Sequence, residues 1–230
     1  MDGGVYLRRL KNLVVADEVR YRAVRSGPCR GCLLPLNLRH DFRTWLGLYE
    51  FELRKILREY TRPGDCCYDV GAASGYYTLA LAKLAAPGTV CAIEAESRLH
   101  EQLKETVARN AGVGSEIDTM NWFVSDALEA SRKRITMDEL VLEQGRRAPD
   151  LIKLDVEGAE HAVLVGAKEV IRRHAPRWII EVHSEELEGQ CRALLEQAGY
   201  TVRVIERNRL LPEQRPLAHN QWLCAQKEKR

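Results

Sequence analysis

The sequence lacks an apolar run of membrane-spanning length, and it lacks a dominant charge of one sign. The first absence predicts no membrane partner, because a helix needs about 20 consecutive apolar residues to cross a bilayer. The 35 Lys and Arg against 33 Asp and Glu leave a net charge of +2, which argues against a dedicated nucleic-acid binder. Residues 1–9 are polar and basic and show no signal-peptide pattern, so we expect a cytoplasmic protein.

The sequence also lacks the cysteine pattern of a zinc site. Cys29 and Cys32 form one CxxC pair, but no second pair and no paired histidines follow to complete four ligands. We interpret the pair as part of a turn around Pro28 and Gly31, with a metal or redox role as the alternative. Four more cysteines lie in strand-like runs and are interpreted as small buried hydrophobic residues: Cys66, Cys67, Cys91 and Cys224.

Two nucleotide-binding signatures are missing as well. There is no Gly-x-Gly-x-x-Gly segment, which disfavours an NAD-dependent oxidoreductase on a similar sheet. There is no Gly-Lys-Ser/Thr sequence, which excludes a P-loop. Any cofactor loop in this chain must therefore follow another pattern.

From Arg62 onward, short apolar runs alternate with helical patterns, which predicts a doubly wound α/β fold. The last two strands have no helix between them and should form a hairpin. We therefore expect a seven-stranded, mostly parallel sheet with the last strand antiparallel. The expected strands are 66–70, 89–93, 120–124, 151–154, 178–182, 200–205 and 221–225. The expected helices are 76–86, one beginning at the N-cap Ser97, a short one at 136–144, 159–173 and 185–198.

Residues 1–61 do not show this alternation. Apolar residues recur at helical spacing over 45–60, which predicts a helix there. We expect residues 1–61 to form a helical cap over the active-site end, and residues 62–230 to form the α/β domain.

The strongest motif is DVGAASG at residues 69–75, where a buried strand leads through a turn of small residues into a helix. Small residues let the backbone approach a ligand, and the helix N-terminus offers N–H groups to an anion. We interpret the anion as the methionyl carboxylate of S-adenosylmethionine. The residues expected to bind this cofactor from the loop are Asp69, Gly71, Ala72, Ser74, Gly75 and Tyr76.

Two acidic residues extend this prediction. Glu94 ends the second strand, about twenty residues beyond the loop, where an acid holds ribose hydroxyls in related folds. Asp126 follows the third strand, where it could accept a hydrogen bond from the adenine amino group. The alternative for Asp126 is a helix cap or a turn residue.

Four segments together resemble the FkbM family of methyltransferases: DVGAASGYYTL at 69–79, ITMDEL at 135–140, DLIKLDVEGAE at 150–160 and IIEVH at 179–183. The resemblance spans roughly residues 45–225, and the KLDVEGAE block at 153–160 is its most specific element. It implies methylation of hydroxyl groups on polyketides, sugars or other secondary metabolites. The chain departs from the family at Ala73, where Asn is frequent, and at Ala95, where Pro is frequent.

The chemistry is expected at the carboxyl ends of the central strands, where ligands bind in this type of fold. Asp155 ends the fourth strand, where we expect it to contact the cofactor and to orient the acceptor or the imidazole, while the other two catalytic candidates, Glu181 and His183, end the fifth. His183 is the preferred general base because its ordinary pKa lies near neutrality. Glu181 needs a partner, for which Lys153 is a candidate. The alternative is that Asp155, Glu181 and His183 hold a divalent cation. Glu157 and Glu160 are interpreted as helix N-terminal acids with a structural role.

The predicted function is S-adenosylmethionine-dependent O-methylation of a small-molecule acceptor, with S-adenosylhomocysteine as product. No metal requirement and no nucleic-acid partner are predicted, and a homodimer is left open. The alternatives are N-methylation of a small molecule and a non-catalytic, methyltransferase-like partner subunit. The intact 69–75 loop argues against the partner subunit.

Overall fold

A seven-stranded sheet forms the centre of the molecule in the computed structural model, which describes residues 16–206 and 221–228. Its strand order is β10-β11-β9-β8-β3-β4-β5, and β11 is the one strand of this sheet that runs opposite to the other six. The predicted mixed sheet is therefore confirmed. The strands are β3 (Cys66–Val70), β4 (Thr89–Ile93), β5 (Glu116–Met120), β8 (Leu151–Leu154), β9 (Arg177–Val182), β10 (Thr201–Ile205) and β11 (Gln221–Gln226).

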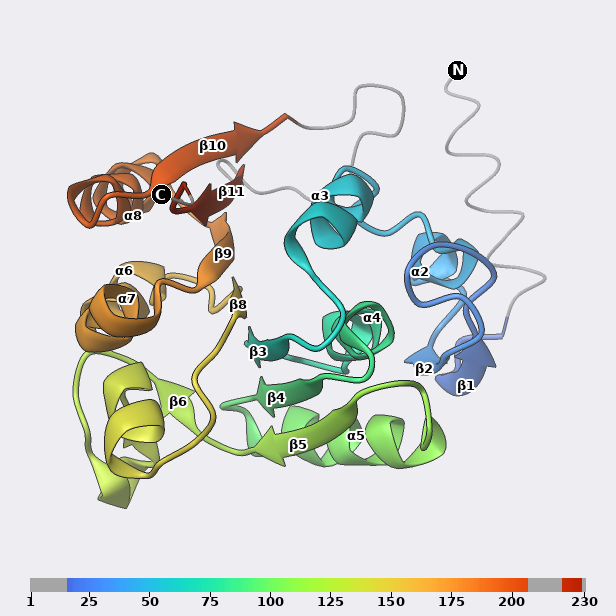
Figure 1. The fold of residues 1–230 in the computed structure, drawn as a ribbon. Coiled ribbons are helices and arrows are strands. Elements are labelled where there is room, and N and C mark those ends of the chain that lie inside the picture. Colours follow the sequence, from blue (N-terminus) through green and yellow to red (C-terminus); the bar gives the residue numbers. More distant parts are fainter. Residues whose placement is uncertain (1–15, 207–220, 229–230) are drawn as a thin grey trace.

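Helices cover both faces of this sheet (Figure 1). One side carries α3 (Leu53–Tyr60), α4 (Tyr76–Ala85) and α5 (Ser97–Arg109), and the other carries α6 (Glu160–Val165), α7 (Lys168–His174) and α8 (Glu185–Gln197). All five residues of β3 are buried, as expected for a central parallel strand. Successive β3 residues pack on opposite sides: Cys67 joins the core beneath α3 and α4, whereas Tyr68 joins the core beneath α6, α7 and α8.

The described part of the N-terminal segment contains a β-hairpin in addition to helices. Strands β1 (Arg20–Ala23) and β2 (Leu33–Leu36) pair antiparallel, and β2 packs against α5. The prediction of a single helix over 45–60 was wrong, because α2 (Phe42–Leu46) ends at Gly47 before α3 begins. Gly47 has a left-handed φ of 77°, and a Cβ there would lie 2.0 Å from the carbonyl oxygen of Ser26.

Three other boundaries differ from the sequence prediction. The expected strand 120–124 is split between the end of β5 and the short β6 (Phe123–Val124), which pairs with β7 (Arg134–Ile135). The helix expected over 159–173 is divided into α6 and α7 near Gly166, where a Cβ would lie 2.1 Å from the carbonyl oxygen of Ser125. Ser97 is the first residue of α5, and its N-cap is Glu96.

The short helix expected over 136–144 is a single π-type turn, η2 (Glu139–Glu143), preceded in the chain by the 3₁₀ turn η1 (Ala130–Arg132). The remaining predicted elements agree with the structure to within one residue at each end.

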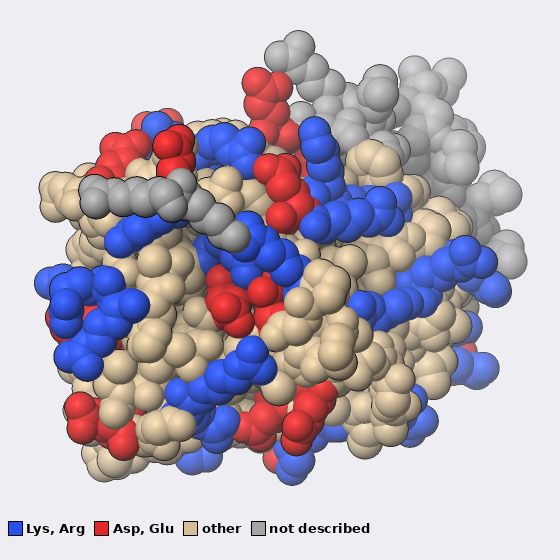
Figure 2. Space-filling view, in the orientation of Figure 1, with Lys and Arg blue, Asp and Glu red and all other residues tan. Residues whose placement is uncertain are grey.

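All seven cysteines are buried and free; Cys29 lies within the predicted turn and Cys32 directly follows it. Among the described residues, no helix is long and apolar enough to span a membrane. Basic and acidic side chains are interspersed over the face shown in Figure 2.

Candidate functional site

The loop after β3 has an unusual backbone. Gly71, Ala73 and Gly75 have left-handed φ angles of 78°, 46° and 95°. A Cβ at position 71 would lie 1.7 Å from the carbonyl oxygen of Asp155, so only glycine lets the ends of β3 and β8 approach this closely. At position 73, Asn would tolerate the left-handed conformation better than Ala, which agrees with the frequent Asn in the family.

Glu94 anchors this loop from the end of β4. Its Oε2 accepts a hydrogen bond from the Ala73 N–H at 2.9 Å, and its Oε1 accepts one from the Glu96 N–H at 2.7 Å. The buried carboxylate is therefore held in place by backbone donors. It also lines a cavity, so its remaining lone pairs can serve a ligand there.

A cavity of about 370 Å³, here called the Glu94 cavity, lies beside the loop. Leu99, Trp122 and Phe123 give it apolar walls, and Glu94 gives it a carboxylate. An apolar chamber with a few fixed polar groups is typical of cofactor sites. Asp126 is exposed, accepts a hydrogen bond from the Ser125 hydroxyl at 3.0 Å, and is not among the residues that line the cavity.

A second cavity of about 210 Å³, here called the Tyr49 cavity, lies on the other side of the loop. The N-terminal segment contributes Pro35, Leu36, Asp41, Thr44 and Tyr49 to its wall. The loop contributes most of the opposite wall through Gly71, Ala72, Ala73, Ser74, Tyr76 and Tyr77, and Lys153 and Asp155 complete it. Gly71, Ala73 and Asp155 line both cavities.

Strand register places a buried charge cluster next to these cavities. Asp69 on β3 pairs with Lys153 on β8, and Asp155 lies two residues further along on the same face. The Lys153 ammonium lies 3.5 Å from Asp69 Oδ1 and 3.3 Å from Asp155 Oδ2, and it donates to the Gly71 carbonyl at 3.3 Å. Sequence reasoning paired Lys153 with Glu181, and the structure pairs it with these two aspartates instead.

Burial and charge act in opposite directions on this cluster. Burial raises the pKa of Asp69, and Lys153 only partly offsets this. Burial alone would lower the pKa of Lys153, but Asp155 and Asp69 raise it above its ordinary value. Burial would raise the pKa of Asp155, yet Lys153 and its other polar neighbours lower it overall. Asp155 is therefore an ionised carboxylate at neutral pH, held by an ammonium.

Asp155, Glu181 and His183 meet as the sequence predicted. Ligand atoms of the three residues all lie within 4.8 Å of one another. Lys153 on β8 is opposite Ile179 on β9, so the same register places Glu181 beside Asp155 and on the same face. His183 follows β9, and its Nε2 lies 3.8 Å from Asp155 Oδ1. This spacing is compatible with a divalent cation, although the Lys153 ammonium already supplies positive charge at Asp155.

Glu160 holds the other nitrogen of His183. Glu160 Oε1 lies 2.5 Å from His183 Nδ1, and the Glu160 side chain is fully buried at the start of α6. This hydrogen bond raises the pKa of His183 despite the opposing effect of burial. The sequence predicted a structural role for Glu160, because its contact with His183 just after β9 depends on tertiary packing.

The structure brings most of the predicted cofactor residues to one place. Gly71, Ala72, Ser74, Tyr76, Glu94 and Asp155 line one or both cavities. Asp69 lies behind the loop, where its Oδ2 accepts a hydrogen bond from the Thr78 hydroxyl at 2.6 Å. Gly75, Glu181 and His183 are outside both linings. Lys153 was missed as a site residue, although its spacing of two from Asp155 in a strand was a usable signal.

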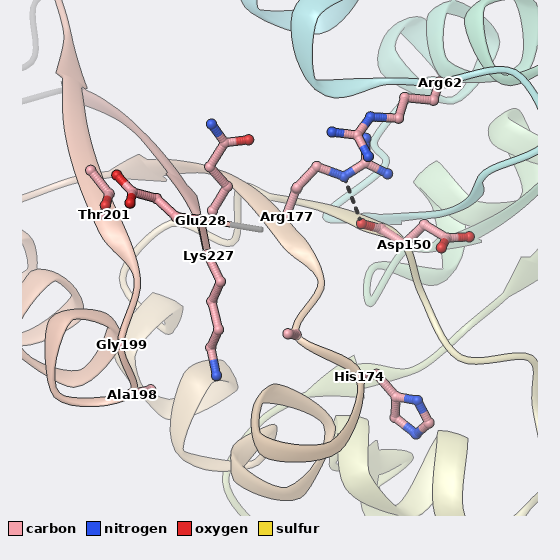
Figure 3. A pocket seen from close by; sticks show the side chains of 11 residues that line it. Arg62, Asp150, His174, Arg177, Ala198, Gly199, Thr201, Lys227 and Glu228 are labelled. Atoms are coloured by element: carbon pink, nitrogen blue, oxygen red, sulfur yellow. Dashed lines mark hydrogen bonds between the residues drawn. The ribbon is translucent and has the colours of Figure 1, made fainter. Parts of the chain in front are cut away.

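A cavity of about 830 Å³ lies at the opposite edge of the sheet (Figure 3). It is bounded by residues at the amino ends of the parallel strands, among them Arg62, Asp150 and Arg177. The Arg177 guanidinium already has protein partners there, because it donates to the Asp150 carbonyl at 3.1 Å and pairs with Asp65 at 2.8 Å. None of the predicted site residues lines this cavity, so cavity size does not identify the site.

Comparison with known proteins agrees with the geometry. The family model of the methyltransferase FkbM domain matches residues 125–202, which include the KLDVEGAE block and β9 but not the 69–75 loop. No curated protein sequence matches the chain.

Solved structures share the fold at low sequence identity. Methyltransferase FkbM from Methylobacillus flagellatus KT is 17% identical with a TM-score of 0.56, over 80% of this chain and 55% of that one. A SAM-dependent O-methyltransferase from Thermotoga maritima is 16% identical with a TM-score of 0.54, over 86% and 74%. P. horikoshii TYW2 in complex with MeSAdo is 14% identical with a TM-score of 0.53, over 93% and 73%.

Proposed function

We propose that this chain methylates a hydroxyl oxygen of a small molecule. The match of the FkbM methyltransferase domain to residues 125–202 confirms the predicted family and the class of S-adenosylmethionine-dependent methyltransferases, from which this proposal starts. The acceptor class is a sugar, a polyketide or another secondary metabolite. This chain spans just over half the length of the FkbM structure that it resembles.

The Glu94 cavity fits S-adenosylmethionine. Its apolar walls at Leu99, Trp122 and Phe123 suit an adenine ring, and the fixed carboxylate of Glu94 suits ribose hydroxyls. The start of α4, directly after the loop, offers helix N-terminal N–H groups to the methionyl carboxylate. When bound, this cofactor supplies a methyl group on a sulfonium, which a nucleophile can take.

The Tyr49 cavity is proposed as the acceptor site, because it shares Asp155 with the Glu94 cavity. Asp155 accepts a hydrogen bond from the acceptor hydroxyl and orients it, while Lys153 keeps Asp155 ionised and fixed. His183 Nε2, beside Asp155, takes the hydroxyl proton as general base. The observation that carries this proposal is the position of Asp155, at the junction of both cavities and next to His183.

Replacing His183 tests this assignment. His183→Ala should leave S-adenosylmethionine affinity unchanged and reduce turnover by about 10²–10⁴-fold, the usual effect of losing a general base. Turnover is measured as S-adenosylhomocysteine formation with a library of hydroxylated acceptors, and the product is identified by mass spectrometry. His174→Ala is the matched control, because His174 lines the cavity at the opposite edge of the sheet.

Other outcomes would favour the alternatives. Turnover at the wild-type rate in His183→Ala would exclude His183 as the general base. A product methylated on nitrogen would favour N-methylation. Loss of wild-type activity on chelation, with recovery on added Mg²⁺, favours a cation held by Asp155, Glu181 and His183. Cofactor binding without turnover on any acceptor favours the non-catalytic partner subunit.

A further inference from the structure

Glu160 is a buried carboxylate. Among the ion pairs of residues 16–206 and 221–228, its only partner of opposite sign is the imidazole of His183. Its Oε1 contacts His183 Nδ1 at 2.5 Å and accepts a hydrogen bond from the Gly158 N–H at 3.0 Å. Its Oε2 is buried and has no hydrogen-bond partner among the residues that the structure describes. A carboxylate removed from water in this way is costly unless a positive charge forms beside it.

Three acidic groups from three different elements act on His183. Asp155 follows β8, Glu181 belongs to β9, and Glu160 begins α6; all three favour the imidazolium form. The two ring nitrogens nevertheless have different surroundings. Nδ1 is bound to Glu160, whereas Nε2 lies 3.8 Å from the Asp155 carboxylate that lines both cavities.

We infer that Glu160 is a positioning residue that fixes His183 as the tautomer with its proton on Nδ1, so that the free Nε2 faces the acceptor side. The inference rests on the proposed function and deepens it. A carboxylate that receives the Nδ1 proton of a histidine sets both the orientation and the tautomer of the ring. The same contact stabilises the imidazolium that forms when Nε2 gains a proton, as in the Ser-His-Asp triad.

The proton balance follows from this arrangement. As the acceptor oxygen forms its bond to the methyl carbon, the carbon–sulfur bond breaks and its electron pair stays on sulfur. The hydroxyl proton moves to His183 Nε2, and the Nδ1 proton stays in the hydrogen bond to Glu160. The imidazolium then returns the Nε2 proton to solvent, which restores the starting tautomer.

A purely structural role predicts something different. An acid in the first turn of a helix stabilises that helix through its dipole, and Glu169 does this at α7. Glu169 lies, like Glu160, in the first turn of its helix, but its side chain is exposed and pairs with Arg172 at 2.7 Å and Arg173 at 2.9 Å. If Glu160 did no more than this, its replacement would lower stability without changing the ring of His183.

The test is nitrogen-15 NMR of the histidine rings in the full chain, which needs no acceptor. Wild-type His183 should show the neutral tautomer protonated on Nδ1 and a pKa above its ordinary value of 6.5. In Glu160→Gln, this pKa should fall towards its ordinary value, and Glu169→Gln should leave it unchanged. Glu160→Asp, which keeps the charge, should retain part of the shift and serves if the Gln variant does not fold.

Kinetics then separates this inference from the function on which it rests. Glu160→Gln should lower kcat about tenfold or more, but less than His183→Ala, and should move the acidic limb of the pH–rate profile to lower pH. An unchanged tautomer, pKa and pH profile in Glu160→Gln would overturn the inference while His183 could remain the base. Full activity of His183→Ala would overturn the proposed base, and with it the positioning role.

Discussion

Replacing Lys153 by Met should destabilise the protein strongly. Met has a similar length and can fill the space, but it cannot supply the ammonium that now lies 3.5 Å from Asp69 and 3.3 Å from Asp155. Asp69 is completely buried and Asp155 is largely so. Removing one partner of a buried ion pair leaves an uncompensated charge, at a cost of roughly 3–5 kcal/mol.

The size of the effect can be measured by urea unfolding and by thermal unfolding. For a domain of this length, a loss of 3–5 kcal/mol corresponds to a fall in Tm of about 6–20 °C. Lys104→Met is the control, because Lys104 forms an exposed ion pair with Glu101 at 3.0 Å that is worth about 0–1 kcal/mol.

A double variant separates lost charge from lost packing. Asp69→Asn combined with Lys153→Met removes the buried charge that the single variant leaves behind, so part of the stability should return. The reasoning is refuted if Lys153→Met costs no more than Lys104→Met. It is also refuted if the two changes at Asp69 and Lys153 are simply additive.

Three further predictions concern the cavities and His183. Glu94→Ala should weaken S-adenosylmethionine binding by about 1.5–3 kcal/mol in calorimetry, as expected for a lost charge-assisted hydrogen bond, with Glu101→Ala unchanged. Equal affinities would remove Glu94 from the cofactor site. Thr44→Phe should fill part of the Tyr49 cavity and raise the acceptor KM while leaving cofactor affinity intact; a change in cofactor affinity alone would contradict this division. Because the pKa of His183 is raised in the fold, its contribution to stability should be complete below pH 6.5 and lost as pH rises through the folded value. Urea unfolding of wild type and His183→Gln across this range should show the loss only in wild type.

The meeting of Asp155, Glu181 and His183 was predictable from the sequence, because it follows from strand ends and alternation. Adjacent parallel strands end at one edge of a sheet, and residues two apart share a face. The partner of Lys153 was not predictable in this way. It depends on which residue of β3 lies opposite residue 153, and the register places Asp69 there.

The errors have physical causes that local patterns do not reveal. The edge strand β5 alternates exposed and partly buried residues such as Glu116 and Ile117, so it is less apolar than the run that was taken for the strand. The predicted helices divide at Gly47, a left-handed C-cap, and at Gly166, and at both positions a neighbouring carbonyl oxygen occupies the space of a side chain. The contact between Glu160 and His183 joins two elements through packing, and no local spacing encodes it.

The position of β11 has a consequence for the order in which the sheet can form during synthesis. Among the described strands, β10 pairs only with β11, which lies between β10 and β9. Until residues 221–226 leave the ribosome, β9 has an open edge and β10 has no strand partner. The strand that carries Glu181 is therefore paired on one side only until β11 joins it, with Trp222 opposite Glu181. An open, apolar strand edge invites pairing with other chains, so a chain stalled or cut before residue 221 should aggregate even though the cofactor loop has already been made.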